Sequence, residues 1–97
     1  MSAYLIFRVS NVTDPAKMQK YREDSPATID AFGGRLLAAG EAETHEGPKE
    51  TARTGIIEFK DMDTARAWIT SPEYKKVQEA RMGAADIQLI LVDGLPG

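Results

Sequence analysis

The run Ile29–Gly40 (IDAFGGRLLAAG) constrains the fold of this chain more than any other stretch, because it joins two kinds of secondary structure. Glycine supplies the left-handed backbone conformation that commonly closes a helix. We therefore expect Gly33 to end a helix and Gly34 to let the chain reverse before Arg35. The sequence predicts a helix upstream of this corner, and downstream it predicts a sheet that packs against that helix.

Four segments are predicted to be strands: Ala3–Val9, which is rich in aromatic and β-branched residues, and Arg35–His45, Gly55–Phe59 and Ile87–Val92. Gly40 within the second segment predicts a bulge or a close approach of the backbone. The glutamates that follow Gly40 make the far half of this segment polar. That polarity is typical of an edge strand or of the stem of an exposed loop.

Two helices are predicted between these strands, and both begin at an aspartate. Asp14 precedes Pro15, which suits the first helical position, and Asp61 precedes the second helix. Each helix also contains a serine followed by proline partway along, at Ser25-Pro26 and at Ser71-Pro72. Because proline removes a backbone hydrogen bond, we expect both helices to kink or restart there.

The element order β-α-β-β-α-β predicts a ferredoxin-like α+β fold for a single domain over residues 1–97, with a four-stranded antiparallel sheet and two kinked helices on one face. In strand Ala3–Val9 both faces are mainly apolar, and the same holds for Ile87–Val92. The sheet face without helices would therefore expose a large apolar patch, which soluble monomers rarely do. We expect an obligate homodimer in which two sheets pack face to face.

Charge and composition bear on several classes of function. The net charge of −3 and the lack of a Lys/Arg cluster argue against a nucleic-acid partner. The chain has no cysteine, which excludes disulfides and thiolate nucleophiles and fits a reducing cytoplasm. The apolar run Tyr4–Phe7 is too short for a signal segment or a membrane span, so we expect a cytoplasmic protein without a membrane partner. With His45 as the single histidine, we expect no metal and no cofactor.

The inward faces of the predicted helices carry the candidate ligand-binding residues. Tyr21, Trp68 and Tyr74 fall on these faces, and their polar tips need partners when buried, which favours a partly wet cleft. Arg81 continues the stripe of Tyr74 and needs a carboxylate, a carbonyl or a ligand anion. Two readings of Arg81 stay open: a salt bridge to Glu58 or Asp86, and an anion-binding role.

Arg8 and Glu58 are the charged members of otherwise apolar strands. We include Arg8 among the candidate ligand-binding residues. A glutamate in an apolar cleft would have a raised pKa and would transfer protons, which makes Glu58 a candidate catalytic residue. His45 is the second catalytic candidate, and alternation places it beside Glu43. A solvent-facing strand end or loop stem is the competing interpretation for all of these residues.

In combination, the landmarks of the chain resemble the family called domain of unknown function 1330, in the dimeric α+β barrel superfamily. The matching positions are Tyr4–Val9, Tyr21, Pro26, Phe32–Leu36, Gly40, Glu46-Gly47, Glu58-Phe59, Ala65–Trp68, Ser71–Tyr74 and Arg81. The chain departs from the family pattern at Ala39-Gly40-Glu41, where Arg-Gly-Gly is expected. The resemblance implies a homodimer with a cleft between sheet and helices, in a superfamily that includes cofactor-independent monooxygenases, lactone isomerases, haem-binding enzymes and small-molecule sensors.

Three hypotheses about function follow. The first is a module that binds a small organic molecule, such as an anionic aromatic carboxylate, in the cleft. The second is a cofactor-independent isomerase or monooxygenase acting on a small organic substrate. The third is a dimeric scaffold whose cleft is filled by its own side chains. An open pocket beside Arg81 and Tyr74 favours the first two hypotheses, and a closed cleft with Arg81 paired internally favours the third.

Overall fold

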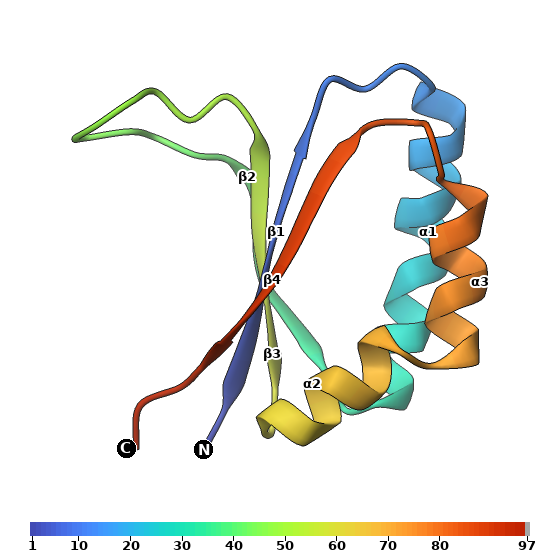
Figure 1. Cartoon of the computed structure of the whole chain (residues 1–97), viewed down its shortest axis with the longest axis vertical. Helices are drawn as coiled ribbons and strands as arrows, with labels where there is room; N and C mark the ends of the chain where they lie inside the picture. The colour runs from blue at the N-terminus through green and yellow to red at the C-terminus, as the bar shows by residue number, and fades with distance from the viewer. Residues whose placement is uncertain (97) are drawn as a thin grey trace.

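The computed structural model describes residues 1–96, which form one antiparallel sheet and three helices (Figure 1). In chain order the elements are β1 (Ala3–Ser10), α1 (Pro15–Ala31), β2 (Arg35–Glu41), β3 (Arg53–Phe59), α2 (Met62–Ile69), α3 (Pro72–Ala80) and β4 (Asp86–Asp93). The strand order across the sheet is β2-β3-β1-β4. This arrangement confirms the predicted ferredoxin-like α+β fold and places β2 at an edge.

The helices lie on one face of the sheet, with α1 and α3 side by side (Figure 1). Residues 42–52, between β2 and β3, lean away from the helices on the other side of the sheet (Figure 1). The strand register sorts the side chains between the two faces. Leu5 pairs with Ile57 and Leu91 on the helix-facing side, whereas Ile6 pairs with Ile56 and Ile90 on the outer side.

The hydrophobic core lies between the helix-facing side of the sheet and the helices. Its buried members are Ala3, Leu5, Ile29, Ile57, Phe59, Ala65, Trp68 and Tyr74. Two-residue alternation explains the strand members, because successive side chains of a strand point to opposite faces. The outer face remains partly apolar, and Ile90 is 41% exposed in the single chain.

The predicted helix boundaries at Asp14, Gly33 and Asp61 are confirmed. The Asp14 carboxylate accepts a hydrogen bond from the Lys17 N–H at 3.1 Å, and the Asp61 carboxylate accepts one from the Thr64 N–H at 2.7 Å. Gly33 has a φ of +70°, and its N–H donates to the Asp30 carbonyl at 3.0 Å. The left-handed conformation that glycine tolerates is therefore what ends α1.

The predicted restart of the helix at Ser25-Pro26 is wrong, because α1 runs without interruption through Pro26. The helix loses the one hydrogen bond that a proline N–H cannot make, yet it buries Ser25, Thr28 and Ile29. That burial keeps the turn in place. At Ser71-Pro72 the prediction is confirmed: α2 ends at Ile69, and the Ser71 hydroxyl accepts from the Tyr74 N–H at 3.2 Å to begin α3.

The second strand is shorter than predicted and is irregular at a different place. It ends at Glu41 instead of His45, and the register shift lies between Leu36 and Ala38, not at Gly40. Pairing with β3 starts at Arg53 opposite Glu41, so the residues between them have no strand partner. Side chains form some of the hydrogen bonds of the backbone groups in this loop. The Thr44 hydroxyl, for example, accepts from the Glu50 N–H at 2.8 Å.

Within residues 1–96, no helix is long and apolar enough to cross a membrane.

Candidate functional site

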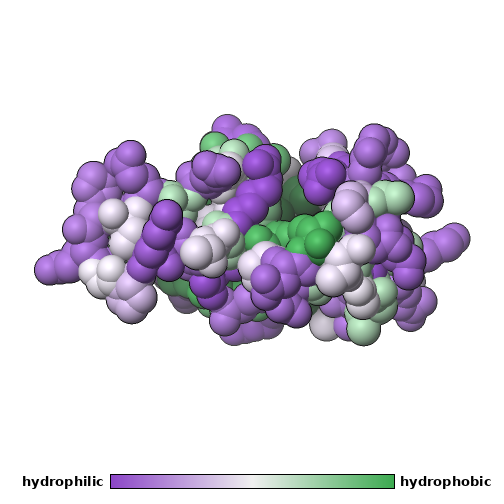
Figure 2. Space-filling model, turned by 90° about the horizontal axis from the view of Figure 1, so that it is seen from above, coloured by the Kyte–Doolittle hydropathy of each residue, from purple (hydrophilic) through white to green (hydrophobic). Residues whose placement is uncertain are grey.

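A cleft of about 320 Å³ lies between α1 and the helix-facing side of the sheet. Seen from above, apolar side chains form the bottom of a hollow whose rims are hydrophilic (Figure 2). The sheet contributes mainly branched and aromatic residues: Leu5, Phe7, Val9, Leu36, Ala39, Ile57, Ile87 and Leu89. The helices contribute the opposite wall: Met18, Tyr21, Ser25, Pro26, Ile29 and Trp68. Such a lining suits an apolar organic molecule.

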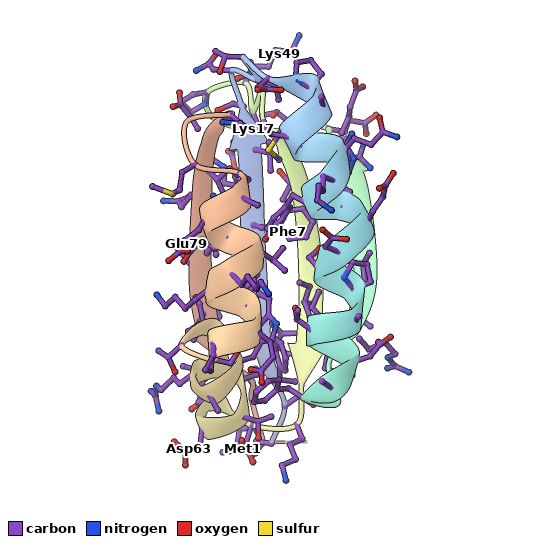
Figure 3. The ribbon with its side chains drawn as sticks, turned by 90° about the vertical axis from the view of Figure 1, so that its right-hand side faces the viewer. Met1, Phe7, Lys17, Lys49, Asp63 and Glu79 are labelled. Atoms are coloured by element: carbon purple, nitrogen blue, oxygen red, sulfur yellow. The ribbon has the colours of Figure 1, made fainter. Side chains whose placement is uncertain are left out.

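Phe7 and Gly55 shape the floor of the cleft. They pair across β1 and β3, and a Cβ atom built on Gly55 would lie 2.0 Å from the Phe7 ring. The ring therefore lies directly over the glycine, which is the close approach that only glycine permits. Figure 3 shows Phe7 between α1 and α3, below the helix layer. The missing side chain at Gly55 thus lets Phe7 lie flat and leaves space above it.

Trp68 is fixed at the inner end of the cleft by polar and aromatic contacts. Its indole N–H donates to the Thr28 hydroxyl at 3.1 Å, and that hydroxyl donates to the Ser25 carbonyl at 2.7 Å. Its ring centroid lies 4.2 Å from that of Tyr74 and 5.4 Å from that of Phe59. Thr28 was not among the predicted site residues, although its spacing after Tyr21 and Ser25 places it on the same helix face.

Tyr21, Tyr74 and Arg81 form a hydrogen-bonded series behind the cleft wall. The hydroxyl oxygens of Tyr21 and Tyr74 lie 2.8 Å apart, and Arg81 Nη2 donates to the Tyr74 hydroxyl at 3.2 Å. The Arg81 guanidinium also lies over the Tyr21 ring, 4.8 Å from its centroid. Only Tyr21 of the three lines the cleft. The predicted residues Tyr21, Trp68, Tyr74 and Arg81 are therefore brought together.

Arg81 is paired differently from either salt bridge that the sequence suggested. Glu58 is bound by Arg35 Nη2 at 3.0 Å, and Asp86 accepts from the Asn11 side chain at 2.8 Å. Arg81 is 7% exposed, its Nε has no partner in residues 1–96, and no carboxylate of this range lies within 4.0 Å of it. The salt-bridge reading is therefore wrong, and a buried cation without a counter-ion stands beside the cleft.

Burial raises the pKa of the Tyr21 phenol well above its ordinary value, and the neighbouring Tyr74 adds to the shift. Tyr21 therefore keeps its proton at neutral pH. A neutral phenol can donate one hydrogen bond and accept others, but it is not a base at neutral pH.

The remaining sequence candidates lie outside the cleft. Arg8 is on the outer face of the sheet, where it donates to Glu50 at 2.7 Å and to Gln88 at 3.1 Å. The Arg8 guanidinium lowers the pKa of the Glu50 carboxyl. Glu58 is also on the outer face, and the Tyr4 hydroxyl donates to it at 3.5 Å.

His45 lies in the exposed loop after β2, with its Nε2 atom 2.6 Å from the Glu43 carboxylate. The two side chains are neighbours as predicted, although neither residue is in a strand, and neither lines the cleft. No group of three His, Asp or Glu side chains suited to a metal ion occurs in the described part of the chain.

Three charged residues at the rim of the cleft were not predicted: Arg22, Asp30 and Arg53. Arg22 and Asp30 follow the same stripe of α1 as Met18 and Pro26, at helical spacing. Arg53 comes from the first position of β3. Helical periodicity places Arg22 and Asp30 next to the inward face of α1. Nothing in the sequence indicates that a cleft is present there.

The family model described as "Domain of unknown function (DUF1330)" matches residues 2–95. No curated protein sequence matches the chain. Several solved structures share its fold. A protein of unknown function from Rhodopseudomonas palustris is 21% identical, with a TM-score of 0.75 over 99% of this chain and 84% of that one.

A dimeric protein of unknown function with a ferredoxin-like fold, from Bacteroides fragilis, is 15% identical, with a TM-score of 0.62 over 96% of each chain. SnoaB, a cofactor-independent oxygenase from Streptomyces nogalater, is 16% identical, with a TM-score of 0.60 over 99% of this chain and 95% of that one. At these identities the likeness establishes the fold and leaves the chemistry of the cleft to its own residues.

Proposed function

Because this chain belongs to the DUF1330 family, whose function is unknown, we propose a function from the cleft itself. The protein binds a small organic molecule, aromatic or otherwise apolar over most of its surface and carrying an anionic group, between α1 and the sheet. One observation carries this proposal: an apolar cleft of about 320 Å³ adjoins a buried guanidinium that has no counter-ion in residues 1–96.

The apolar cleft and the unpaired guanidinium each support the binding of a ligand. A chain of this size gains stability by closing apolar space, since unfilled volume forfeits packing contacts. An unpaired buried cation also costs free energy that an internal carboxylate would recover. A purely structural dimer has a reason to avoid both features. A ligand with an apolar body would fill the cleft, and its anionic group would bring a negative charge toward the guanidinium.

We further propose that the protein works as a homodimer through the outer face of its sheet. Ile56, Ile6 and Ile90 lie side by side across β3, β1 and β4 on that face. The similar protein from Bacteroides fragilis is described as dimeric. A two-fold partner would cover this row and leave the cleft, which lies on the helix side, open to solvent.

A cofactor-independent enzyme is the second candidate, supported by the likeness in fold to the oxygenase SnoaB. Such an enzyme needs a group that exchanges protons with the substrate. Glu58 and His45 lie outside the cleft, and the raised pKa of Tyr21 keeps its phenol from acting as a base at neutral pH. The cleft residues therefore support binding more strongly than turnover.

Trp68 is the single tryptophan and lines the cleft, so its fluorescence reports on occupancy. We expect 4-ethylbenzoate to change Trp68 emission saturably and to raise the melting temperature of the protein. Ala39→Phe, which adds a ring within the cleft, should abolish the response, whereas Ala27→Phe on the exposed side of α1 should leave it intact. A wild-type protein that responds to no aromatic acid or hydrocarbon contradicts the proposal.

A further inference from the structure

Arg81 is next to the cleft but not part of its wall. The lining includes Tyr21 and Trp68, whereas Tyr74 and Arg81 lie behind them. The guanidinium donates to the Tyr74 hydroxyl, which is bonded to the Tyr21 hydroxyl, and it also lies over the Tyr21 ring. A ligand in the cleft would therefore meet Tyr21 and not the arginine.

A count of hydroxyl hydrogens shows what Tyr21 offers to the cleft. The Tyr74 oxygen accepts from Arg81, and the bond between the two phenols uses one of their two hydrogens, whichever residue donates. The second hydroxyl hydrogen has no acceptor within residues 1–96. The two phenols thus carry one hydroxyl donor more than they use between them.

The charge of Arg81 sets the direction of the series. A cation that donates to the Tyr74 oxygen makes the Tyr74 hydroxyl a stronger donor, because hydrogen bonds in a series polarise one another. In that direction Tyr74 donates to Tyr21, and the hydrogen left over is that of Tyr21, the residue that lines the cleft. Arg81 is 7% exposed, so little water screens this effect.

We propose that Arg81, Tyr74 and Tyr21 form a donor relay that presents the Tyr21 hydroxyl to an anionic oxygen of the ligand, such as a carboxylate or an enolate. This inference rests on the proposed function and names the group that the cleft selects. Tyr21 contacts the ligand, and Tyr74 and Arg81 are positioning residues. The ligand is therefore oriented with its oxygen toward α3 and its apolar body over Phe7.

Arg22 and Arg53 at the rim are the competing anion sites. Both are exposed, and neither forms a salt bridge within residues 1–96. Exposed charges attract an anion across the solvent but discriminate weakly, because water and salt screen them. We therefore assign to Arg22 and Arg53 the attraction of the anionic ligand toward the cleft. We assign to the relay the discrimination between anionic and neutral ligands.

Three probes of similar shape separate the contribution of the relay to affinity from that of the apolar cleft. 4-Ethylbenzoate carries an anionic oxygen, 4-ethylacetophenone carries a neutral acceptor, and 1,4-diethylbenzene carries no acceptor. Trp68 fluorescence gives the dissociation constant of each. The wild type should prefer the acid to the hydrocarbon by at least tenfold, with the ketone between them, since a hydrogen bond to a charged group has about this strength. Tyr21→Phe should remove this preference while changing hydrocarbon affinity by less than about threefold.

Arg81→Gln should reduce the acid preference as Tyr21→Phe does, and Arg81→Lys should restore part of it. A merely structural Arg81 would lower affinity for all three probes together. The paired variant Arg22→Gln, Arg53→Gln is the matched control and should keep the ratio of acid to hydrocarbon affinity. Should Arg81→Gln fail to fold, Tyr21→Phe alone decides, since it removes only one oxygen.

Two outcomes overturn the relay and leave the cleft proposal standing: equal affinity of the wild type for acid and hydrocarbon, or loss of the acid preference in the rim variant instead of Tyr21→Phe. Failure of all three probes to bind the wild type overturns the proposed function itself.

Discussion

The hydroxyl oxygens of Tyr21 and Tyr74 lie 2.8 Å apart, although the two residues are 53 positions apart in the chain. This contact joins α1 to α3 and connects the cleft wall to Arg81. Their rings meet edge to face, with centroids 6.3 Å apart. The edge-to-face packing involves the rings, and the hydrogen bond involves only the hydroxyls. Removal of one hydroxyl oxygen therefore leaves the ring packing in place.

A double-mutant cycle measures this contact. Tyr21→Phe should lower the free energy of unfolding by about 0.5–1.5 kcal/mol, the usual worth of one hydrogen bond. Tyr74→Phe should cost more, about 1–3 kcal/mol, because it also leaves Arg81 without an acceptor. Urea denaturation of both single variants and the double variant gives a coupling of at least 0.5 kcal/mol on this account, as expected for residues in contact. Strict additivity would show that the hydroxyls do not interact.

The pKa of Tyr21 makes stability depend on pH. The pKa of the Tyr21 phenol is raised in the folded state. As the pH rises, the unfolded chain therefore loses this proton first, near pH 10. The free energy of unfolding should therefore fall above about pH 10, by up to about 1.4 kcal/mol per pH unit. Tyr21→Phe lacks this contribution, so its stability deficit relative to the wild type should narrow between pH 9 and pH 11. The free energy of unfolding is measured by urea denaturation at each pH. A difference between wild type and Tyr21→Phe that stays constant from pH 9 to pH 11 would mean that the pKa of Tyr21 is not raised.

Gly33 tests the corner that ends α1. Replacement by valine forces a β-branched residue into a φ of +70° and should cost about 1–3 kcal/mol. Gly40→Val is the matched control, because a Cβ there meets nothing within 4 Å and its φ lies outside the left-handed region. Thermal unfolding should show a clear loss for Gly33→Val and little change for Gly40→Val. Equal stability of the two variants would contradict a left-handed helix end.

The dimer can be tested on the outer face of the sheet. Ile90→Asp places a charge in the isoleucine row and should dissociate the homodimer, because a buried unpaired carboxylate is costly. Ala67→Asp adds the same charge on the exposed side of α2 and should leave the dimer intact. Sedimentation at micromolar concentration distinguishes the two results. A wild type that sediments as a monomer would remove the basis for a sheet-to-sheet dimer.

Local sequence signals predicted most of the fold. Asp14, Gly33 and Asp61 act within a few residues of themselves, so their roles follow from backbone chemistry alone. Alternation in β1 and β4 indicated two apolar faces for the same reason. Pro26 shows where local signals fail, since tertiary burial of Ser25, Thr28 and Ile29 keeps the helix continuous.

The candidate site was predictable only in part. Helical spacing placed Tyr21, Trp68, Tyr74 and Arg81 on inward faces, and the structure brings them together. The partners of Arg81 depend on how α1 packs against α3, which spacing within one helix does not encode. The depth of the cleft likewise depends on Phe7 lying over Gly55, a contact between two strands.

A crystal structure of the protein with 4-ethylbenzoate tests the central claim most directly. We expect the ring between α1 and the sheet, over Phe7, with a carboxylate oxygen within about 3 Å of the Tyr21 hydroxyl, the distance of a charge-assisted hydrogen bond. The hydrogen bond that Arg81 donates to the Tyr74 hydroxyl should be retained behind the ligand. A carboxylate held by Arg22 or Arg53 at the rim, or an acid bound outside the cleft, would contradict the account.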